Sequence, residues 1–419
     1  MPRAASLGGA AGAGLGPGLF AAVLIDALGG GLWLPFALIF FTQGRGVGIG
    51  AAGVALTVGA LVGLAVGQLS GRVLDSERFG PHRALVTSSL VRAATFSVYP
   101  LVSGAVQVAV VVAVVSGADR VFWTANYPYL SSFVQGREVD RLFGTITVLQ
   151  IVGFGVGAAA AGLFADNPAA LNGLAWLNAG SFAVSGVLLW RQPSQPRTRS
   201  AGPRDAPDGD TVPRPRAVWR DRPYLLLCGV QILLVLMVSS FVVVLPLVIV
   251  DTLAGPTWLV GVGVVVANTV LAVAQKPVIR RVRTRPRRQA ILAALPLYAV
   301  AFLVLASVTR GTGTAALVAA VLIAAALEGA AESLSIAIML SAASDAAPKG
   351  SEGRYSAAFQ ASWGLAEVIA PLLFTRLLLV GTGALWLTLV GVAVATAPVV
   401  LRAARQLPPR VFAVAGAAR

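Results

Sequence analysis

Twelve long apolar runs constrain the fold of this 419-residue chain more than any other feature. Each run holds about 20 to 30 residues rich in Ala, Val, Leu and Gly, which is enough for an α-helix to cross a bilayer. Hydrophobic residues make up 57% of the chain and charged residues only 12%, whereas about 25% of residues are charged in a soluble domain. The chain is therefore predicted to be an all-α polytopic membrane protein with twelve transmembrane helices, and an ordinary soluble enzyme is excluded.

The runs form two sets of six predicted helices. The first set lies at 17–41, 51–72, 83–103, 106–129, 142–165 and 170–190. The second set lies at 223–250, 257–280, 288–308, 314–343, 353–379 and 383–404. The Pro- and Arg-rich segment between the sets cannot bury a core and is predicted to be a disordered cytoplasmic linker. The predicted parts are thus an N-terminal six-helix bundle (1–190), the linker (191–222), a C-terminal six-helix bundle (223–405) and a cytoplasmic tail (406–419).

Basic residues are divided unevenly between alternate loops. Arginines cluster on one side, in loops that include 72–83, 137–141 and 191–222, whereas the opposite loops offer only Arg45 and Arg310, with Arg376 close by. The positive-inside rule therefore predicts that both termini are cytoplasmic. The net charge of +15 is explained by this topology and by anionic lipids, not by nucleic acid. The preference for arginine over lysine, with abundant Ala, Gly and Val, is typical of a GC-rich bacterial genome and predicts a location in the bacterial inner membrane.

The scarcity of cysteine, histidine and lysine excludes several kinds of chemistry. Cys228 is the one cysteine and His82 the one histidine, so we expect no disulfide, no metal site and no cofactor. The two lysines, Lys276 and Lys349, are followed by Pro and Gly, so the chain has no Gly-Lys-Ser/Thr sequence for ATP. A secondary, ion-coupled carrier is therefore favoured over a pump driven by ATP.

The segment after the second run carries a motif of glycine and charged residues. It reads Gly67-Gln68-Leu69-Ser70-Gly71-Arg72-Val73-Leu74-Asp75 and continues to Gly80 and Arg83. The equivalent place in the second half holds a shorter echo, Val273-Ala274-Gln275 followed by Pro286. The motif resembles the conserved loop between helices 2 and 3 of the major facilitator superfamily, with Ser76 and Glu77 inserted.

The resemblance implies the fold of that family, two six-helix bundles, and a cytoplasmic latch. The latch residues it implies are Gly67, Gly71, Arg72, Asp75, Gly80 and Arg83. Alternatively, these charges only anchor the loop at the cytoplasmic face. Glycines in the fifth run, among them Gly153 and Gly157, resemble a motif of exporters that exchange drugs for protons, but the proline of that motif is absent and close helix packing explains small residues equally well.

Six ionisable side chains fall near the middle of predicted helices. They are Asp26, Asp119, Arg120, Glu328, Glu332 and Glu367. A charge at the bilayer centre costs roughly 2.5–3.5 kcal/mol, so each is expected to face the bundle interior or a water-filled cavity. In the family that the chain resembles, helices 1, 4, 7 and 10 line a central cavity, and five of the six residues fall on helices 1, 4 and 10. The alternative for each residue is an interhelical pair that only holds the bundle together.

The spacing of these groups predicts two pairings. Adjacent helical residues point about 100° apart, so Asp119 and Arg120 are expected to have different partners, and Arg120 is predicted to reach Asp26. Glu328 and Glu332 lie four residues apart on one helical face and are predicted to share a proton, as in a proton relay.

Neutral polar and aromatic side chains complete the predicted cavity. The candidates for substrate contact are Trp33, Trp123, Asn126, Gln150, Gln231, Gln360 and Trp363. Carboxylates outnumber cations, and tryptophan can bind a cation through its ring. We therefore expect a secondary active transporter, a monomer in lipid, that exports small amphipathic or cationic compounds in exchange for protons by alternating access.

Three alternatives remain open at this point. The first is proton-symport uptake of a small metabolite, such as an anion held by Arg120. The second is a membrane-embedded enzyme that acts on lipid and uses His82, Asp75 and Glu77. The third is a scaffold that transports nothing.

Overall fold

The computed structural model describes residues 16–74, 80–131, 133, 137–165, 168–194, 218–282, 286–348 and 352–412. These residues are almost entirely helical and contain no strand, which confirms the predicted all-α fold. Most of the predicted linker, residues 195–217, lies outside the described part of the chain.

The helices follow the predicted runs closely. The first half contains α2 (Pro17–Trp33), η1 (Leu34–Phe36), α3 (Ala37–Ile39), η2 (Phe40–Gly44), α4 (Ile49–Leu74), α5 (Pro81–Val98), η3 (Tyr99–Leu101), α6 (Ala105–Ser131), α7 (Arg137–Phe164) and α8 (Pro168–Trp190). The second half contains η4 (Val218–Arg220), α9 (Arg222–Val243), α10 (Leu245–Leu247), η5 (Val248–Thr252), α11 (Trp258–Val282), α12 (Arg287–Ala306), α13 (Thr314–Ala346), α14 (Glu352–Val380), α15 (Thr382–Gln406) and α16 (Pro409–Phe412).

Eleven helical spans of the described chain are long and apolar enough to cross a membrane. The twelfth long helix, α5, has 18 residues but is more polar, because it carries Arg83, Arg92 and several hydroxyl side chains. It nevertheless packs between α6 and α8 inside the first bundle. A helix of this length can cross a membrane only where neighbouring helices cover its polar groups.

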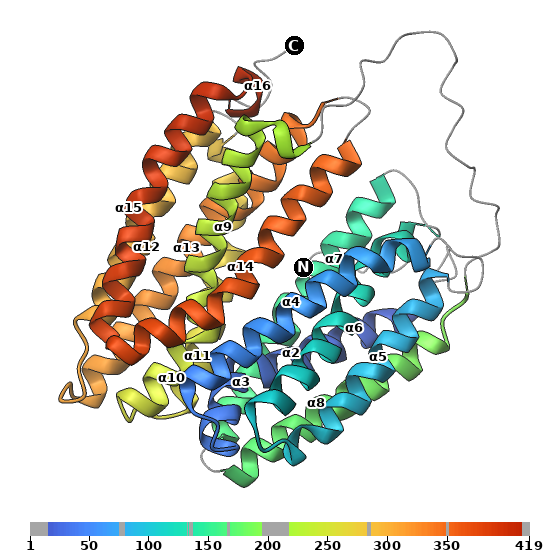
Figure 1. The fold of residues 1–419 in the computed structure, drawn as a ribbon. Helices are drawn as coiled ribbons and strands as arrows, with labels where there is room; N and C mark the ends of the chain where they lie inside the picture. Colours follow the sequence, from blue (N-terminus) through green and yellow to red (C-terminus); the bar gives the residue numbers. More distant parts are fainter. Residues whose placement is uncertain are drawn as a thin grey trace, which may run out of the picture.

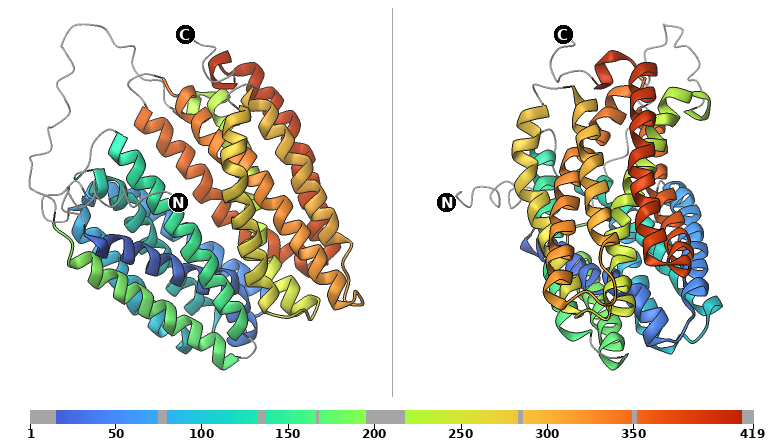
Figure 2. Two further views of the ribbon diagram at one scale, coloured as in Figure 1. Left: turned by 180° about the vertical axis from the view of Figure 1, so that it is seen from behind. Right: turned by 90° about the vertical axis from the view of Figure 1, so that its left-hand side faces the viewer.

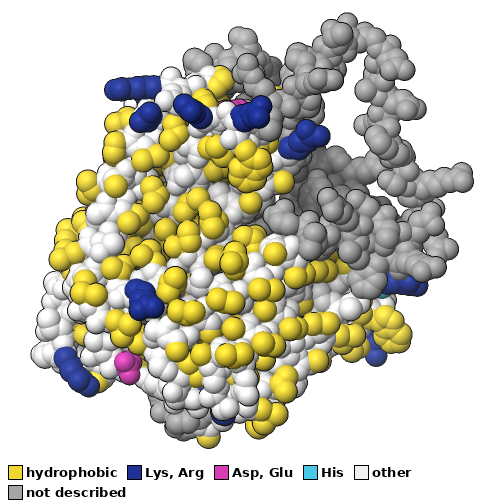
Figure 3. Space-filling model, in the orientation of Figure 1, with side chains coloured by type: hydrophobic (Ala, Val, Ile, Leu, Met, Phe, Trp, Pro, Cys, Tyr) yellow, Lys and Arg dark blue, Asp and Glu magenta, His cyan; other side chains and the backbone are white. Residues whose placement is uncertain are grey.

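The two bundles are in contact at one end and apart at the other. We call the end where α8 finishes and α9 begins the linker end, and the opposite end the distal end. Figures 1 and 2 show the bundles side by side, with ribbons that diverge toward the linker end. On the face shown in Figure 3, a row of basic side chains lies along the linker end of the second bundle, while apolar side chains cover the middle, where lipid would contact the protein.

Contacts between the bundles run from the distal end to mid-span. Helix α4 packs on α14, and α7 packs on α11. The hydroxyl of Thr57 donates to the carbonyl of Val368 at 2.9 Å, and that of Thr257 donates to Gly162 at 2.9 Å. Gly261 lets α11 approach so closely that an added Cβ would overlap the carbonyl of Ala158 on α7. The two bundles thus meet at two equivalent seams, because α4 and α11 occupy the same place in each half.

The first and seventh long helices are broken at equivalent places. Helix α2 gives way to a 3₁₀ turn at Pro35 and then to a π-helical turn, and α9 breaks before Pro246 and also ends in a π-helical turn. Proline lacks the N–H that would continue the helix. The two broken ends meet at the distal end, where Gln43 donates to Asp251 at 3.1 Å.

Glycines bring α2 and α7 together inside the first bundle. An added Cβ at Gly157 would overlap the carbonyl oxygen of Leu28, and one at Gly153 would crowd Ala27. Without these side chains the two backbones pack directly against each other, as in membrane helices generally. The glycine run that resembled an exporter motif therefore has a packing role in this structure.

We predict that Gly157→Ala destabilises the protein by about 1–3 kcal/mol, because the added methyl must push α2 away from α7. The thermal unfolding midpoint in detergent should fall. The matched control is Gly144→Ala on the same helix, where an added Cβ meets nothing within 4 Å. An equal fall in both variants would contradict the packing argument.

Candidate functional site

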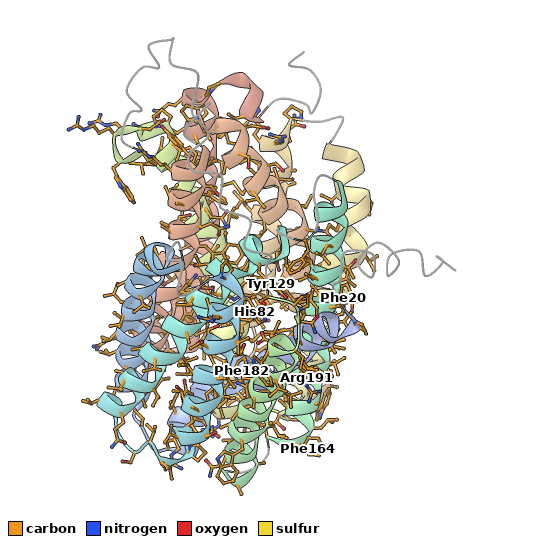
Figure 4. All side chains as sticks on the ribbon, turned by 90° about the vertical axis from the view of Figure 1, so that its right-hand side faces the viewer. Phe20, His82, Tyr129, Phe164, Phe182 and Arg191 are labelled. Carbon is orange, nitrogen blue, oxygen red and sulfur yellow. The ribbon has the colours of Figure 1, made fainter. Side chains whose placement is uncertain are left out.

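A buried arginine lies between two carboxylates in the first bundle. The Nη2 atom of Arg92 on α5 donates to Asp26 of α2 at 2.9 Å, and Nη1 donates to Asp119 of α6 at 3.2 Å. Arg92 is only 2% exposed. Its guanidinium carbon lies 4.4 Å from the ring centre of Phe122 and 4.2 Å from that of Phe182, and Figure 4 shows Phe182 within the bundle. Ion pairing and two aromatic faces together replace the water that this charge has lost.

Sequence reasoning missed Arg92, and the predicted pairing of Arg120 with Asp26 is wrong. The sequence signal for Arg92 is its position in the middle of the third apolar run, where a charge needs a partner. Arg92 is the partner of Asp26 instead. Asp119 faces Arg92, and Arg120 therefore faces elsewhere, because neighbouring residues on a helix point about 100° apart. The expectation that Asp119 and Arg120 have different partners is confirmed.

Arg120 forms an ion pair that joins the two bundles. Its Nη2 donates to Glu367 of α14, and the same carboxylate accepts from the indole of Trp363 at 2.9 Å. The arginine side chain passes two glycines: an added Cβ at Gly67 would lie 2.8 Å from the Cβ of Arg120, and one at Gly364 would lie 3.5 Å from Nη2. Arg120 is 30% exposed and Glu367 is 44% exposed, so the pair lies at an open surface between the bundles.

Glu328 and Glu332 occupy the second bundle without a basic partner. Glu328 on α13 is 3% exposed. Both side chains line an apolar pocket between α9, α11 and α13, together with Asn268 of α11. No described residue that lines this pocket is basic. Two carboxylates in such surroundings cannot both stay ionised at low cost, so they can hold a proton between them.

The predicted contact residues fall into different environments. Trp33 is buried in an aromatic cluster with Phe40 and Phe96, whose ring centres lie 4.9 and 5.0 Å away. Trp123 is 47% exposed on α6, one residue from Phe122. The remaining candidates are buried (Asn126, Gln231), half-buried (Gln150, Trp363) or exposed (Gln360). The structure brings Trp363 to the ion pair between the bundles and places Trp33 in the core of the first bundle.

The predicted latch falls mostly beyond the described side chains. Asp75 and Glu77 lie outside the described residues, and only the helical backbone of α4 is described at Gly71 and Arg72. Gly80 precedes α5, and Arg83 is exposed in its first turn. Gly67 leaves room for the side chain of Arg120, because an added Cβ there would crowd it. The latch therefore stays a prediction.

His82, the one histidine, packs within the first bundle. Its Nε2 atom lies 2.9 Å from the carbonyl oxygen of Leu189, and its ring centre lies 5.6 Å from that of Tyr129. Figure 4 shows His82 and Tyr129 on neighbouring helices at the linker end of this bundle. Within the part of the chain that the structure describes, no three His, Cys, Asp or Glu side chains are placed to hold a metal ion.

Comparison with known proteins gives a consistent result. A family model described as the Major Facilitator Superfamily matches residues 19–371. No curated protein matches the sequence.

Solved transporter structures share the fold. A mutant nucleoside transporter has a TM-score of 0.73 at 12% identity, with 92% of this chain and 98% of that chain covered. A D-xylose–proton symporter has a TM-score of 0.72 at 14% identity, with 93% and 96% covered. A POT family transporter has a TM-score of 0.70 at 14% identity, with 93% and 97% covered. At these identities the likeness shows the fold alone.

We predict that Arg92→Met destabilises the protein by about 3 kcal/mol or more, because it leaves two carboxylates near mid-membrane without their cation. Adding Asp26→Asn should recover at least half of the loss, since it removes the more buried of the two charges. Thermal unfolding of the single and double variants in detergent measures both steps. A double variant that is no more stable than Arg92→Met alone would show that the unpaired carboxylates do not cause the loss of stability.

Proposed function

The chain belongs to the Major Facilitator Superfamily, and from this premise we propose that it exports small amphipathic or cationic compounds in exchange for protons. Membership makes the chain a multi-pass membrane protein and a secondary transporter of small molecules. Direction, coupling ion and substrate class are the parts that we infer from the site.

The balance of charge at mid-span supports a cationic substrate. The described side chains there comprise five carboxylates, at Asp26, Asp119, Glu328, Glu332 and Glu367, and two cations, Arg92 and Arg120. Arg92 is bound by two carboxylates, and Arg120 is bound by a third. Neither arginine is left to hold an anionic substrate, so this balance favours a cation over the anion that uptake through Arg120 would require.

Protons are the coupling ion that this arrangement suits. A carboxylate buried in apolar surroundings is stabilised either by a cation or by taking up a proton. Glu328 and Glu332 have no cation partner among the residues that line their pocket. A cationic substrate and a proton would compete for the same pair, and this competition is the simplest basis for exchange.

The contacts between the bundles suit alternating access. The seams close the distal end, while Gln360 of α14, nearer the linker end, is exposed. If the linker end is cytoplasmic, as the arginines suggest, this conformation opens to the side from which an exporter takes its substrate. The ion pair between Arg120 and Glu367 would hold the bundles together at mid-span and break as they rock apart.

Proton-symport uptake is the second candidate. It uses the same fold and the same carboxylates, but the substrate moves in the same direction as the proton. The charge balance bears on substrate charge and not on direction, so a transport measurement separates the two.

The test is transport of cationic dyes, ethidium among them, into proteoliposomes with an imposed pH gradient. We predict that an acidic lumen accelerates dye entry by at least tenfold through the wild-type protein, because protons leave in exchange. Glu328→Gln and Glu332→Gln should abolish this acceleration, and Asp26→Asn should abolish transport. Asp345→Asn, on the same helix as the two glutamates but paired with Arg287 near the linker end, is the matched control and should transport normally.

Two results would contradict the proposal. Acceleration by an acidic exterior would make the protein a symporter. A full response to the pH gradient in Asp26→Asn and in both glutamate variants would remove these carboxylates from coupling.

A further inference from the structure

The pocket that contains Glu328 and Glu332 is built almost wholly by the second bundle. Its walls are apolar and include Val238, Phe241, Leu245 and Val321. Asn268 adds one neutral polar group. The pocket thus lies within one bundle, apart from one residue contributed by the other.

The chemistry of the pocket specifies a ligand with two parts. Apolar walls bind an aromatic or aliphatic body through burial of its surface. The carboxylates are the charged groups at the pocket, and no basic residue among the described lining groups neutralises them. A compact organic cation would complement both features, whereas an anion or a sugar would leave the carboxylates or the apolar walls without a partner.

Phe154 of α7 is the one lining residue that comes from the first bundle. Helix α7 is fixed at this point by α2, because an added Cβ at Gly31 would overlap the backbone of Phe154. Next to it, Gly155 faces Val265 and Asn268 of α11. Phe154 therefore sits at the seam where the two bundles meet, and a separation of α7 from α11 would withdraw its ring from the pocket.

We propose that this pocket is a binding subsite for a small lipophilic organic cation, and that Phe154 is the lid that closes it when α7 meets α11. The charged group of the ligand sits at Glu328 and Glu332, and its apolar body sits against Phe241 and the valines. Because it names a substrate class and a place for it, the inference rests on the proposed function. Phe154 acts on access and residence time, and the glutamates act on affinity.

The first experiment measures equilibrium binding of radiolabelled 1-methyl-4-phenylpyridinium to the purified full-length protein in nanodiscs at pH 8. This probe is small and permanently charged, so its charge does not change with pH. We expect saturable binding that Glu328→Gln and Glu332→Gln each weaken by at least tenfold. Asp345→Asn should bind as the wild type does, and 4-methylbiphenyl, an uncharged analogue of the probe, should not compete.

The second experiment measures the dissociation rate of the same probe. Phe154→Ala should raise the rate by at least tenfold, and Phe154→Leu, which keeps more of the bulk, should raise it less. The matched control is Phe164→Ala on the same helix, because Phe164 is 65% exposed near the distal end (Figure 4) and does not line the pocket. Unchanged dissociation from both Phe154 variants would overturn the assignment of the lid.

Other results overturn the pocket or separate it from the proposed function. Binding that survives in the Glu328→Gln/Glu332→Gln double variant would place the cation elsewhere. If a pH gradient drives dye exchange but the pocket variants bind the probe normally, the pocket is wrong and the function stands. If the probe binds through both glutamates but no pH gradient drives transport, the pocket stands and the proposed coupling is wrong.

Discussion

A charge in the middle of a bilayer must be paired with an opposite charge or neutralised by a proton, and this constraint organises the site. Water is not available to solvate the charge, and an unpaired one costs several kcal/mol. In the first bundle Arg92 satisfies Asp26 and Asp119, and between the bundles Arg120 satisfies Glu367. In the second bundle Glu328 and Glu332 have no such cation among their pocket neighbours. The two halves share a fold but differ in electrostatics. Proton and substrate would act in the second half, at the carboxylates whose pocket has no basic residue among its described lining groups.

The seams between the bundles are where a rocking movement would act. The seams between the bundles depend on close approach of helices, as at Gly261, where α11 packs against the carbonyl of Ala158. At the other seam side chains fit against glycines of the facing helix: an added Cβ at Gly53 of α4 would overlap Thr375 of α14, and one at Gly364 of α14 would overlap Leu64 of α4. Phe154 is placed at one of these seams and at the pocket together. A movement of the bundles at this seam would therefore change access to Glu328 and Glu332.

Much of the fold was predictable from the sequence, because twenty or more apolar residues in a row leave a chain few choices in a membrane. Helix α5 differs from the others. It follows the predicted run, but its polar Arg92 is stabilised by Asp26 and Asp119 on other helices, and no local pattern reveals these partners. The carboxylates of the site were found from their depth alone. Their partners were not, because the pairing of Asp26 with Arg92, or of Arg120 with Glu367, depends on which helices pack together and on how each is rotated. The breaks beside Pro35 and Pro246 had a signal in the prolines, but their π-helical ends arise from tertiary packing.

The most direct test of the account is whether binding of a cation releases a proton from Glu328 and Glu332. The protein is held in weakly buffered detergent at pH 7, 1-methyl-4-phenylpyridinium is added, and a pH-indicator dye records proton release against the amount of probe bound. If both ligands compete for one carboxylate pair, the account predicts release approaching about one proton per bound cation in the wild type and almost none in the Glu328→Gln/Glu332→Gln double variant. Binding without proton release, or equal release from the double variant, would contradict it.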